Sequence, residues 1–207
     1  SVCGAANAGY YVLSIGQSNQ TACSAGTYQA LTGQIACDDA DAGYFVGITG
    51  QPSQTECAIG TYQSLTGQVA CDNADAGYYV AQTTQTTQVG CAIGTYQALT
   101  GQGSCDDADA GYYVSLLAGS AQTTQTACLA GTYNPDIGST NSSACGDADA
   151  GYFVVITGQS SQTECAIGTY QPLTGQSFCD DADAGYFVNQ MAQSNHTECE
   201  LGTYQPL

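Results

Sequence analysis

The sequence predicts a small disulfide-rich fold that is mainly β and irregular: a linear tandem-repeat array of short β-hairpins with few or no helices. Three observations lead to this prediction. Leu, Ile, Val and Phe number only 32 of the 207 residues, which is too few for an ordinary hydrophobic core. Twelve cysteines recur at regular spacing, and nearly every aromatic residue lies one or two positions after a glycine.

The cysteine spacing defines the repeats. Successive cysteines lie alternately far apart, as from Cys37 to Cys57, and closer together, as from Cys57 to Cys71, which gives a 34-residue repeat. In the fourth copy both gaps are longer by three, and insertions of this kind are typical of surface loops. Six copies follow one another without a linker: 1–36, 37–70, 71–104, 105–144, 145–178 and the truncated 179–207.

The aromatic residues mark the expected strands. Every Tyr and Phe except Phe178 lies in a GTY or a GY[YF]V segment. Glycine adopts a positive φ at little cost, and the aromatic and β-branched residues after it favour a very short strand. Turns separate these strands, as in LTGQ at 65–68, where Gly67 suits a hairpin. Because no segment has a sustained 3.6-residue period, we expect few or no helices.

The charge excludes several classes of partner. The chain has 18 Asp and Glu residues and no Lys or Arg, which gives a formal net charge of −18. Nothing in it can neutralise nucleic-acid phosphates or bind an anionic membrane surface. No run approaches the roughly 18 apolar residues that cross a bilayer, so we expect no nucleic-acid partner and no membrane span in this window.

The cysteines indicate a disulfide framework, and hence an extracellular protein that is secreted or displayed on a cell surface. Structural zinc sites usually bring two ligands within two to four residues, whereas even the closest cysteines here, such as Cys23 and Cys37, are much further apart. Two regular pairing schemes are open. Either each longer segment is closed, as from Cys37 to Cys57, or each shorter one is, as from Cys57 to Cys71.

A family resemblance bears on this choice. The segment CAIGTYQSLTGQVACDNADAGYYV at 57–80 resembles the cysteine-rich repeats of ephrin-receptor-like and tumour-necrosis-factor-receptor-like ectodomains and of ciliate surface antigens. Two cysteines that those repeats share fall on Ala74 and Gln88 here. The resemblance implies that the cysteine before GTY bridges to the next one, and that Cys3 and Cys199 pair with neighbouring units. The bridged cysteines would then be Cys23, Cys37, Cys57, Cys71, Cys91, Cys105, Cys128, Cys145, Cys165 and Cys179.

Three sequons predict covalent glycans. Asn19, Asn141 and Asn195 each begin an Asn-X-Ser/Thr sequence, which is the N-glycosylation acceptor of secreted proteins. Asn19 and Asn195 both lie four residues before a cysteine, which predicts that this part of the longer loop is exposed. The TTQTTQ stretch at 83–88 is a candidate for O-linked sugar.

Acidic pairs raise the possibility of calcium binding. Thirteen of the 14 aspartates lie in CDDADAG-like segments, and alternate Asp residues before a Gly resemble half of a calcium loop. A solvated acidic turn is the alternative, because a full calcium loop has further acidic ligands. The candidate ligands are Asp39, Asp41, Asp107, Asp109, Asp147, Asp149, Asp181 and Asp183. We expect no other cofactor.

These features favour a structural function. His196 is the only histidine, and its counterpart in the first copy is Gln20, so we predict no catalytic residues and no enzyme activity. Three residues, TGQ, would join the end LGTYQPL to the start SVC in register, which suggests a longer or end-linked array. We therefore expect a structural repeat segment of an extracellular, glycosylated fibre or surface coat whose partner is itself. The alternative is a cysteine-rich receptor or adhesion ectodomain that binds a protein or glycan.

Overall fold

The computed structural model describes residues 3–115 and 121–204. Residues 1–2, 116–120 and 205–207, which fall in the first, fourth and last predicted repeats, lie outside the described part. The chain divides into two compact units. One comprises Ser1–Cys91 with Gln97–Cys105, and the other comprises Ala92–Tyr96 with Asp106–Leu207.

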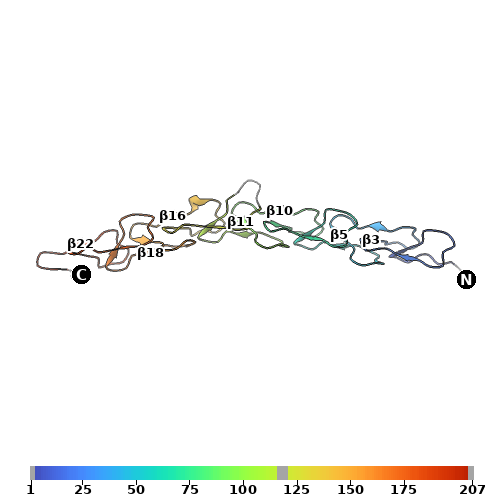
Figure 1. Cartoon of the computed structure of the whole chain (residues 1–207), viewed down its shortest axis with the longest axis horizontal. Coiled ribbons are helices and arrows are strands. Elements are labelled where there is room, and N and C mark those ends of the chain that lie inside the picture. Colours follow the sequence, from blue (N-terminus) through green and yellow to red (C-terminus); the bar gives the residue numbers. More distant parts are fainter. Residues whose placement is uncertain (1–2, 116–120, 205–207) are drawn as a thin grey trace. The chain divides into compact units, whose positions relative to one another are not determined.

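The described residues form eleven two-stranded antiparallel hairpins, each made of two strands that are consecutive in the sequence. In each unit the hairpins follow one another in chain order (Figure 1). The first unit holds the pairs β1 (Tyr10–Tyr11) with β2 (Thr21–Ala22), β3 (Thr27–Tyr28) with β4 (Asp38–Asp39), β5 (Tyr44–Phe45) with β6 (Thr55–Glu56), β7 (Thr61–Tyr62) with β8 (Asp72–Asn73), and β9 (Tyr78–Tyr79) with β10 (Val89–Gly90). The second holds β11 (Thr95–Tyr96) with β12 (Asp106–Asp107), β13 (Tyr112–Tyr113) with β14 (Thr126–Ala127), β15 (Thr132–Tyr133) with β16 (Gly146–Asp147), β17 (Tyr152–Phe153) with β18 (Thr163–Glu164), β19 (Thr169–Tyr170) with β20 (Asp180–Asp181), and β21 (Tyr186–Phe187) with β22 (Thr197–Glu198).

These hairpins and five disulfides confirm the predicted fold class. Among the described residues the one helical element is a 3-10 turn, η1 (Ser142–Ala144). In that part of the chain no helix has the length and apolar character needed to cross a bilayer.

The backbone has a 17-residue period, which is half of the 34-residue sequence repeat. A glycine with φ between +81° and +90° opens each hairpin, and one more follows the last hairpin. Their spacing is constant except on either side of Gly131, where it is longer by three. They are Gly9, Gly26, Gly43, Gly60, Gly77, Gly94, Gly111, Gly131, Gly151, Gly168, Gly185 and Gly202. The two longer spacings account for the two insertions of the fourth copy, one in each of two successive hairpins.

Within each unit the hairpins bond to the next hairpin and to the next but one. In the first unit the amide of Gly43 donates to the carbonyl of Gln63 in the following hairpin at 2.8 Å. The amide of Gly67 donates to the carbonyl of Ala40, two hairpins back, at 2.7 Å. The glycines also allow a close approach, because a Cβ on Gly26 would lie 2.3 Å from the carbonyl oxygen of Gly67. Each strand has only two residues and can pair few backbone groups itself. Hydrogen bonds to neighbouring hairpins therefore pair further amides and carbonyls.

The core consists of small side chains. Away from the two ends of the chain, the valine after each GY[YF] strand is buried, and so is the residue directly after each return strand, which is alternately cysteine and alanine. Representative members are Val46, Val80, Cys57 and Ala74, with exposed fractions of at most 1%. A core of this size explains how the fold forms with so few large aliphatic residues, since close backbone bonding and disulfides supply the rest of the stability.

In alternate hairpins a buried glutamine replaces the valine. The Gln63 amide nitrogen donates to the carbonyl of Ala70 at 3.0 Å, and its amide oxygen accepts from the amide of Leu65 at 3.1 Å. Gln29, Gln97 and Gln171 make the equivalent bonds. Because these bonds satisfy the buried amide, the glutamine can occupy the core and hold its own loop in place.

Candidate functional site: hairpin closures and exposed loops

Disulfides close every second hairpin loop. The five bridges join the two cysteines of the shorter segments, with Cα–Cα distances of 5.5–5.8 Å: Cys23–Cys37, Cys57–Cys71, Cys91–Cys105, Cys128–Cys145 and Cys165–Cys179. Of the two schemes that the spacing allowed, the structure has the one in which the shorter segment is closed. Closing loops of 14 to 17 residues stabilises the fold by about 3 kcal/mol per bridge in the chain-entropy account.

Cys3 and Cys199 are the free cysteines. Cys3 is exposed and Cys199 is half-buried. The Cys199 amide donates to the carbonyl of Gly185 at 2.9 Å, as the amide of Cys165 does to Gly151. Cys199 therefore occupies the position of the first cysteine of a closed loop.

The intervening hairpins are closed by a glutamine, a feature that sequence reasoning missed. The amide of Asp41 donates to Oε1 of Gln54 at 2.7 Å, and Nε2 of Gln54 donates to Oδ2 of Asp41 at 2.7 Å. We call this pair of bonds the glutamine clasp. It recurs between Asp75 and Gln88, Asp109 and Gln125, and Asp149 and Gln162.

The clasp stands where the other hairpins have a disulfide. Ala74 follows its return strand as Cys57 does, since their amides donate to Gly60 and Gly43 respectively. The separation from Ala74 to Gln88 along the chain equals that from Cys57 to Cys71. Ala74 and Gln88 are the positions where the resembling families have cysteines, and the bonds between Gln88 and Asp75, the residue after Ala74, thus stand in for a bridge. The regular spacing of the opening glycines is the sequence signal that would have identified it.

His196 replaces the glutamine in the last hairpin. Its ring stacks on Tyr186 with a centroid distance of 4.1 Å and contacts Tyr170 at 4.5 Å. Its Nδ1 accepts from the amide of Asp183 at 3.4 Å and lies 3.9 Å from that residue's Oδ2. Through these contacts His196 closes the last hairpin loop, where other hairpins have a clasp.

The structure places all three sequon asparagines at exposed positions. Asn19 and Asn195 lie in equivalent bends, two residues before the return strands β2 and β22. Asn141 differs because it caps η1, and its Oδ1 accepts from the amide of Ser143 at 2.9 Å and from the Ser143 hydroxyl.

The predicted calcium pairs divide between two environments. Asp39 lies on an exposed strand, whereas Asp41 engages its carboxylate in the clasp. The same division holds for Asp107 with Asp109 and for Asp147 with Asp149, while Asp181 lies on the exposed strand β20 and Asp183 faces His196. Within residues 3–115 and 121–204, no group of three or more His, Cys, Asp or Glu side chains could hold a metal ion. Calcium binding stays a prediction.

The acidic residues also act on nearby tyrosines. Partial burial raises the pKa of Tyr28 above its usual value, and the carboxylates of Asp41 and Asp38 raise the pKa further. Tyr96 and Tyr170 have raised pKa values from the same combination of burial and two carboxylates. Negative charge therefore lies close to the half-buried aromatic residues.

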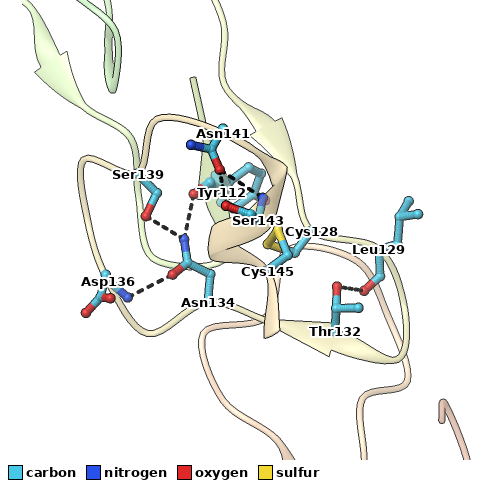
Figure 2. The surroundings of a disulfide bond; sticks show 10 residues. All are labelled: Tyr112, Cys128, Leu129, Thr132, Asn134, Asp136, Ser139, Asn141, Ser143 and Cys145. Atoms are coloured by element: carbon cyan, nitrogen blue, oxygen red, sulfur yellow. Dashed lines mark hydrogen bonds between the residues drawn. A yellow bond between two sulfur atoms is a disulfide. The ribbon is translucent and has the colours of Figure 1, made fainter. Parts of the chain in front are cut away.

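The fourth copy departs from the pattern around its disulfide (Figure 2). Asn134 takes the place of the buried glutamine, and its Nδ2 donates to the Tyr112 carbonyl and to the Ser139 hydroxyl, both at 2.9 Å. Its Oδ1 accepts from the amide of Asp136 at 3.2 Å. Figure 2 also shows η1, capped by Asn141, leading to the bridged Cys145. The inserted residues thus reshape one loop while its disulfide is kept.

Comparisons with known proteins add no relative. No protein-family model matches the chain, and no curated protein matches it either. The residues and their geometry are therefore the basis of the functional argument.

Proposed function

We propose that the chain is a structural repeat segment of an extracellular, glycosylated fibre or surface coat. The observation that carries the proposal is the regular backbone bonding of each hairpin to the next two within each unit. Repeated hairpins of this kind extend in one dimension by adding copies, and each copy is stabilised by its neighbours. The proposal includes no enzymatic activity.

The disulfides support the extracellular part of the proposal, because they form and persist in oxidising compartments. Five disulfides close the loops of a fold with a core of Val, Ala and Cys. Bridges at this density are typical of secreted and cell-surface proteins and would not persist in a reducing cytosol. The exposed sequons at Asn19, Asn141 and Asn195 fit the same compartment.

Repeated exposed side chains and the free cysteines support self-association. An exposed leucine recurs five residues after the opening glycine in GTY hairpins, with exposed fractions of 62–64% at Leu31, Leu65, Leu99 and Leu173. A recurring apolar position suits contact between like hairpins of two copies. Cys3 and Cys199 would add covalent links, because each is unpaired and one is exposed.

Electron microscopy and non-reducing electrophoresis of the natural material test the proposal. We expect filaments, or disulfide-linked multimers that reduction converts to single chains. A Cys3→Ser/Cys199→Ser variant should lose the covalent multimers and keep its five internal bridges. Dispersed monomers in which both thiols stay free would contradict the proposal.

Calcium would act as a counter-ion in this fibre. The net charge of −18 creates self-repulsion that divalent cations relieve. Thermal melts with and without millimolar calcium, with magnesium as the control, test this. An unchanged midpoint in calcium would contradict this role, and a shift in calcium that magnesium does not reproduce would indicate a specific site.

A receptor or adhesion module is the second candidate, and the fourth copy is the observation that favours it. Its loop at 134–145 differs from the others in the buried Asn134, the 3-10 turn and the Asn141 cap. A binding module usually has one diversified surface. If this function holds, exchanging 134–145 for the corresponding residues of the fifth copy should abolish ligand capture on a glycan array without altering assembly.

A further inference from the structure

The inference concerns one position on the longer loops, four residues before the first cysteine of each disulfide-type loop. We call it the acceptor position. Asn19 and Asn195 occupy it in the first and last copies, and both begin sequons. The intervening copies have a hydroxyl residue at every one of these positions: Ser53, Thr87, Thr124 and Ser161. All six residues are exposed.

The neighbouring residues explain why the acceptor position faces solvent. In the second copy, Gln54 follows Ser53 and folds inward to form the clasp with Asp41. Thr55 then begins strand β6 and is exposed. Over 53–55 an exposed residue is therefore followed by a partly buried one and then by another exposed one. Cys57 and its disulfide follow two residues later. In this copy the acceptor is thereby presented on an exposed bend between two closures.

The hydroxyl groups at this position are free to react. In the described part of the chain, none of the four acceptor hydroxyls makes a hydrogen bond to another protein group. The threonine of each GTY strand is different, because its Oγ1 donates to a backbone carbonyl three residues earlier, at 2.8 Å for Thr61 and 2.9 Å for Thr95. A hydroxyl held in a hydrogen bond is a poorer glycosyl acceptor than an exposed hydroxyl without one.

We propose that Ser53, Thr87, Thr124 and Ser161 carry O-linked sugar, so that every copy bears a glycan at the same place on its hairpin. The inference rests on the proposed function, which puts the chain in a glycosylating compartment. In each transfer the Oγ atom attacks the anomeric carbon of a nucleoside-diphosphate sugar and forms a C–O bond. The bond between that carbon and the diphosphate breaks, the nucleoside diphosphate leaves with the electron pair, and the hydroxyl proton passes to a base of the transferase.

The shared position is also compatible with an N-linked glycan. The sequences from the acceptor onward read NQT, SQT, TQV, TQT, SQT and NHT. A change of Ser53 to Asn would complete an Asn-X-Thr sequon with Thr55, which the chain already has in place. The first and last copies thus have an N-linked acceptor sequence at a position where the other copies have a hydroxyl residue.

Glycopeptide mass spectrometry of the natural protein tests the inference. Trypsin cannot be used because the chain has no Lys or Arg, whereas cleavage before aspartate releases segments such as 41–71, which has one acceptor position and one internal disulfide. Electron-transfer fragmentation after reduction then assigns the sugar to a residue. We expect hexose or N-acetylhexosamine on the four acceptor hydroxyls, N-glycans on Asn19 and Asn195, and bare Thr61 and Thr95.

The outcomes separate this inference from the proposed function. Glycans on the asparagines with four bare acceptor hydroxyls would overturn the inference and leave the proposed function standing. Sugar on Thr61 or Thr95 instead of the acceptors would also overturn it. A chain without any glycan would contradict both. As a second measurement, a Ser53→Asn variant secreted from a eukaryotic host should gain one enzyme-removable N-glycan, and a folded variant without that gain would show that the position is inaccessible.

Discussion

The contribution of close contact between hairpins to stability can be measured with two separate glycine-to-alanine variants, each made in the same local sequence. Gly60 and Gly168 both lie in CAIGTYQ and have φ values of +85° and +90°. A Cβ on Gly60 would lie 2.1 Å from the carbonyl oxygen of Gly101, well inside ordinary contact, whereas a Cβ on Gly168 would meet no described atom within 4 Å. The two substitutions therefore share the backbone strain and differ in the clash.

The expected magnitudes follow from these two terms. A left-handed backbone at a non-glycine residue costs about 1–2 kcal/mol, which is the whole expected cost of Gly168→Ala. Overpacking against the Gly101 carbonyl adds about 1–3 kcal/mol in Gly60→Ala. At about 2–4 °C per kcal/mol for a chain of this size, Gly60→Ala should lower Tm by about 2–12 °C more than Gly168→Ala does.

Thermal unfolding followed by circular dichroism, with all disulfides intact, measures the difference. A non-reducing gel controls for altered pairing in either variant. If both variants lose the same Tm within error, the close approach of hairpins two apart contributes nothing measurable, and the account of how this fold is stabilised fails.

Three further predictions address the closures, the turns and the tyrosines. Ala74→Cys/Gln88→Cys should form a sixth disulfide and raise stability by about 3 kcal/mol, because the pair is placed as Cys57 and Cys71 are. Titration of the unfolded variant should then find only the thiols of Cys3 and Cys199 free, with Ala74→Cys alone as the control that has one more, and free thiols at both introduced cysteines would contradict the equivalence. Thr84 has a φ of +60° where neighbouring hairpins have glycine, so Thr84→Gly should raise stability by about 0.5–1 kcal/mol in chemical denaturation, and a loss would show that the Thr side chain is needed. Raised pKa values keep Tyr28, Tyr96 and Tyr170 neutral in the folded chain at a pH where the unfolded phenols ionise, so stability should fall as pH rises above about 10. Absorbance titration of the phenolates alongside unfolding tests this, and a flat stability profile up to about pH 11 would contradict it.

The sequence was sufficient to predict the hairpins, because glycine before each aromatic pair and regular cysteines are local signals. Gly67 in LTGQ has the positive φ that its turn predicted, and the strands begin directly after the opening glycines. The backbone pairing between hairpins could not be predicted, since it joins residues of different hairpins, such as Gly67 and Ala40, and leaves no trace in composition.

The clasp was missed for a different reason. Alternate hairpins place chemically unlike residues at the same backbone position: Cys57 against Ala74, Cys71 against Gln88, and Val46 against Gln63. A comparison of residue types therefore finds a period of 34, whereas backbone geometry has a period of 17. His196 illustrates the same limit, because its ring occupies a glutamine position through stacking that the sequence alone does not specify.

The alternation of disulfide-closed and clasp-closed loops determines what a protease cut does to the chain. A protease that cuts one peptide bond between Cys57 and Cys71 leaves both new ends tethered through sulfur. A cut between Asp75 and Gln88 leaves them held by non-covalent contacts, which are the clasp, hydrogen bonds to adjoining hairpins and the packing of Val80. Cuts in the first set of loops should then leave the chain covalently joined, whereas cuts in the second set sever it, so resistance to proteolysis depends on how well every second loop is protected.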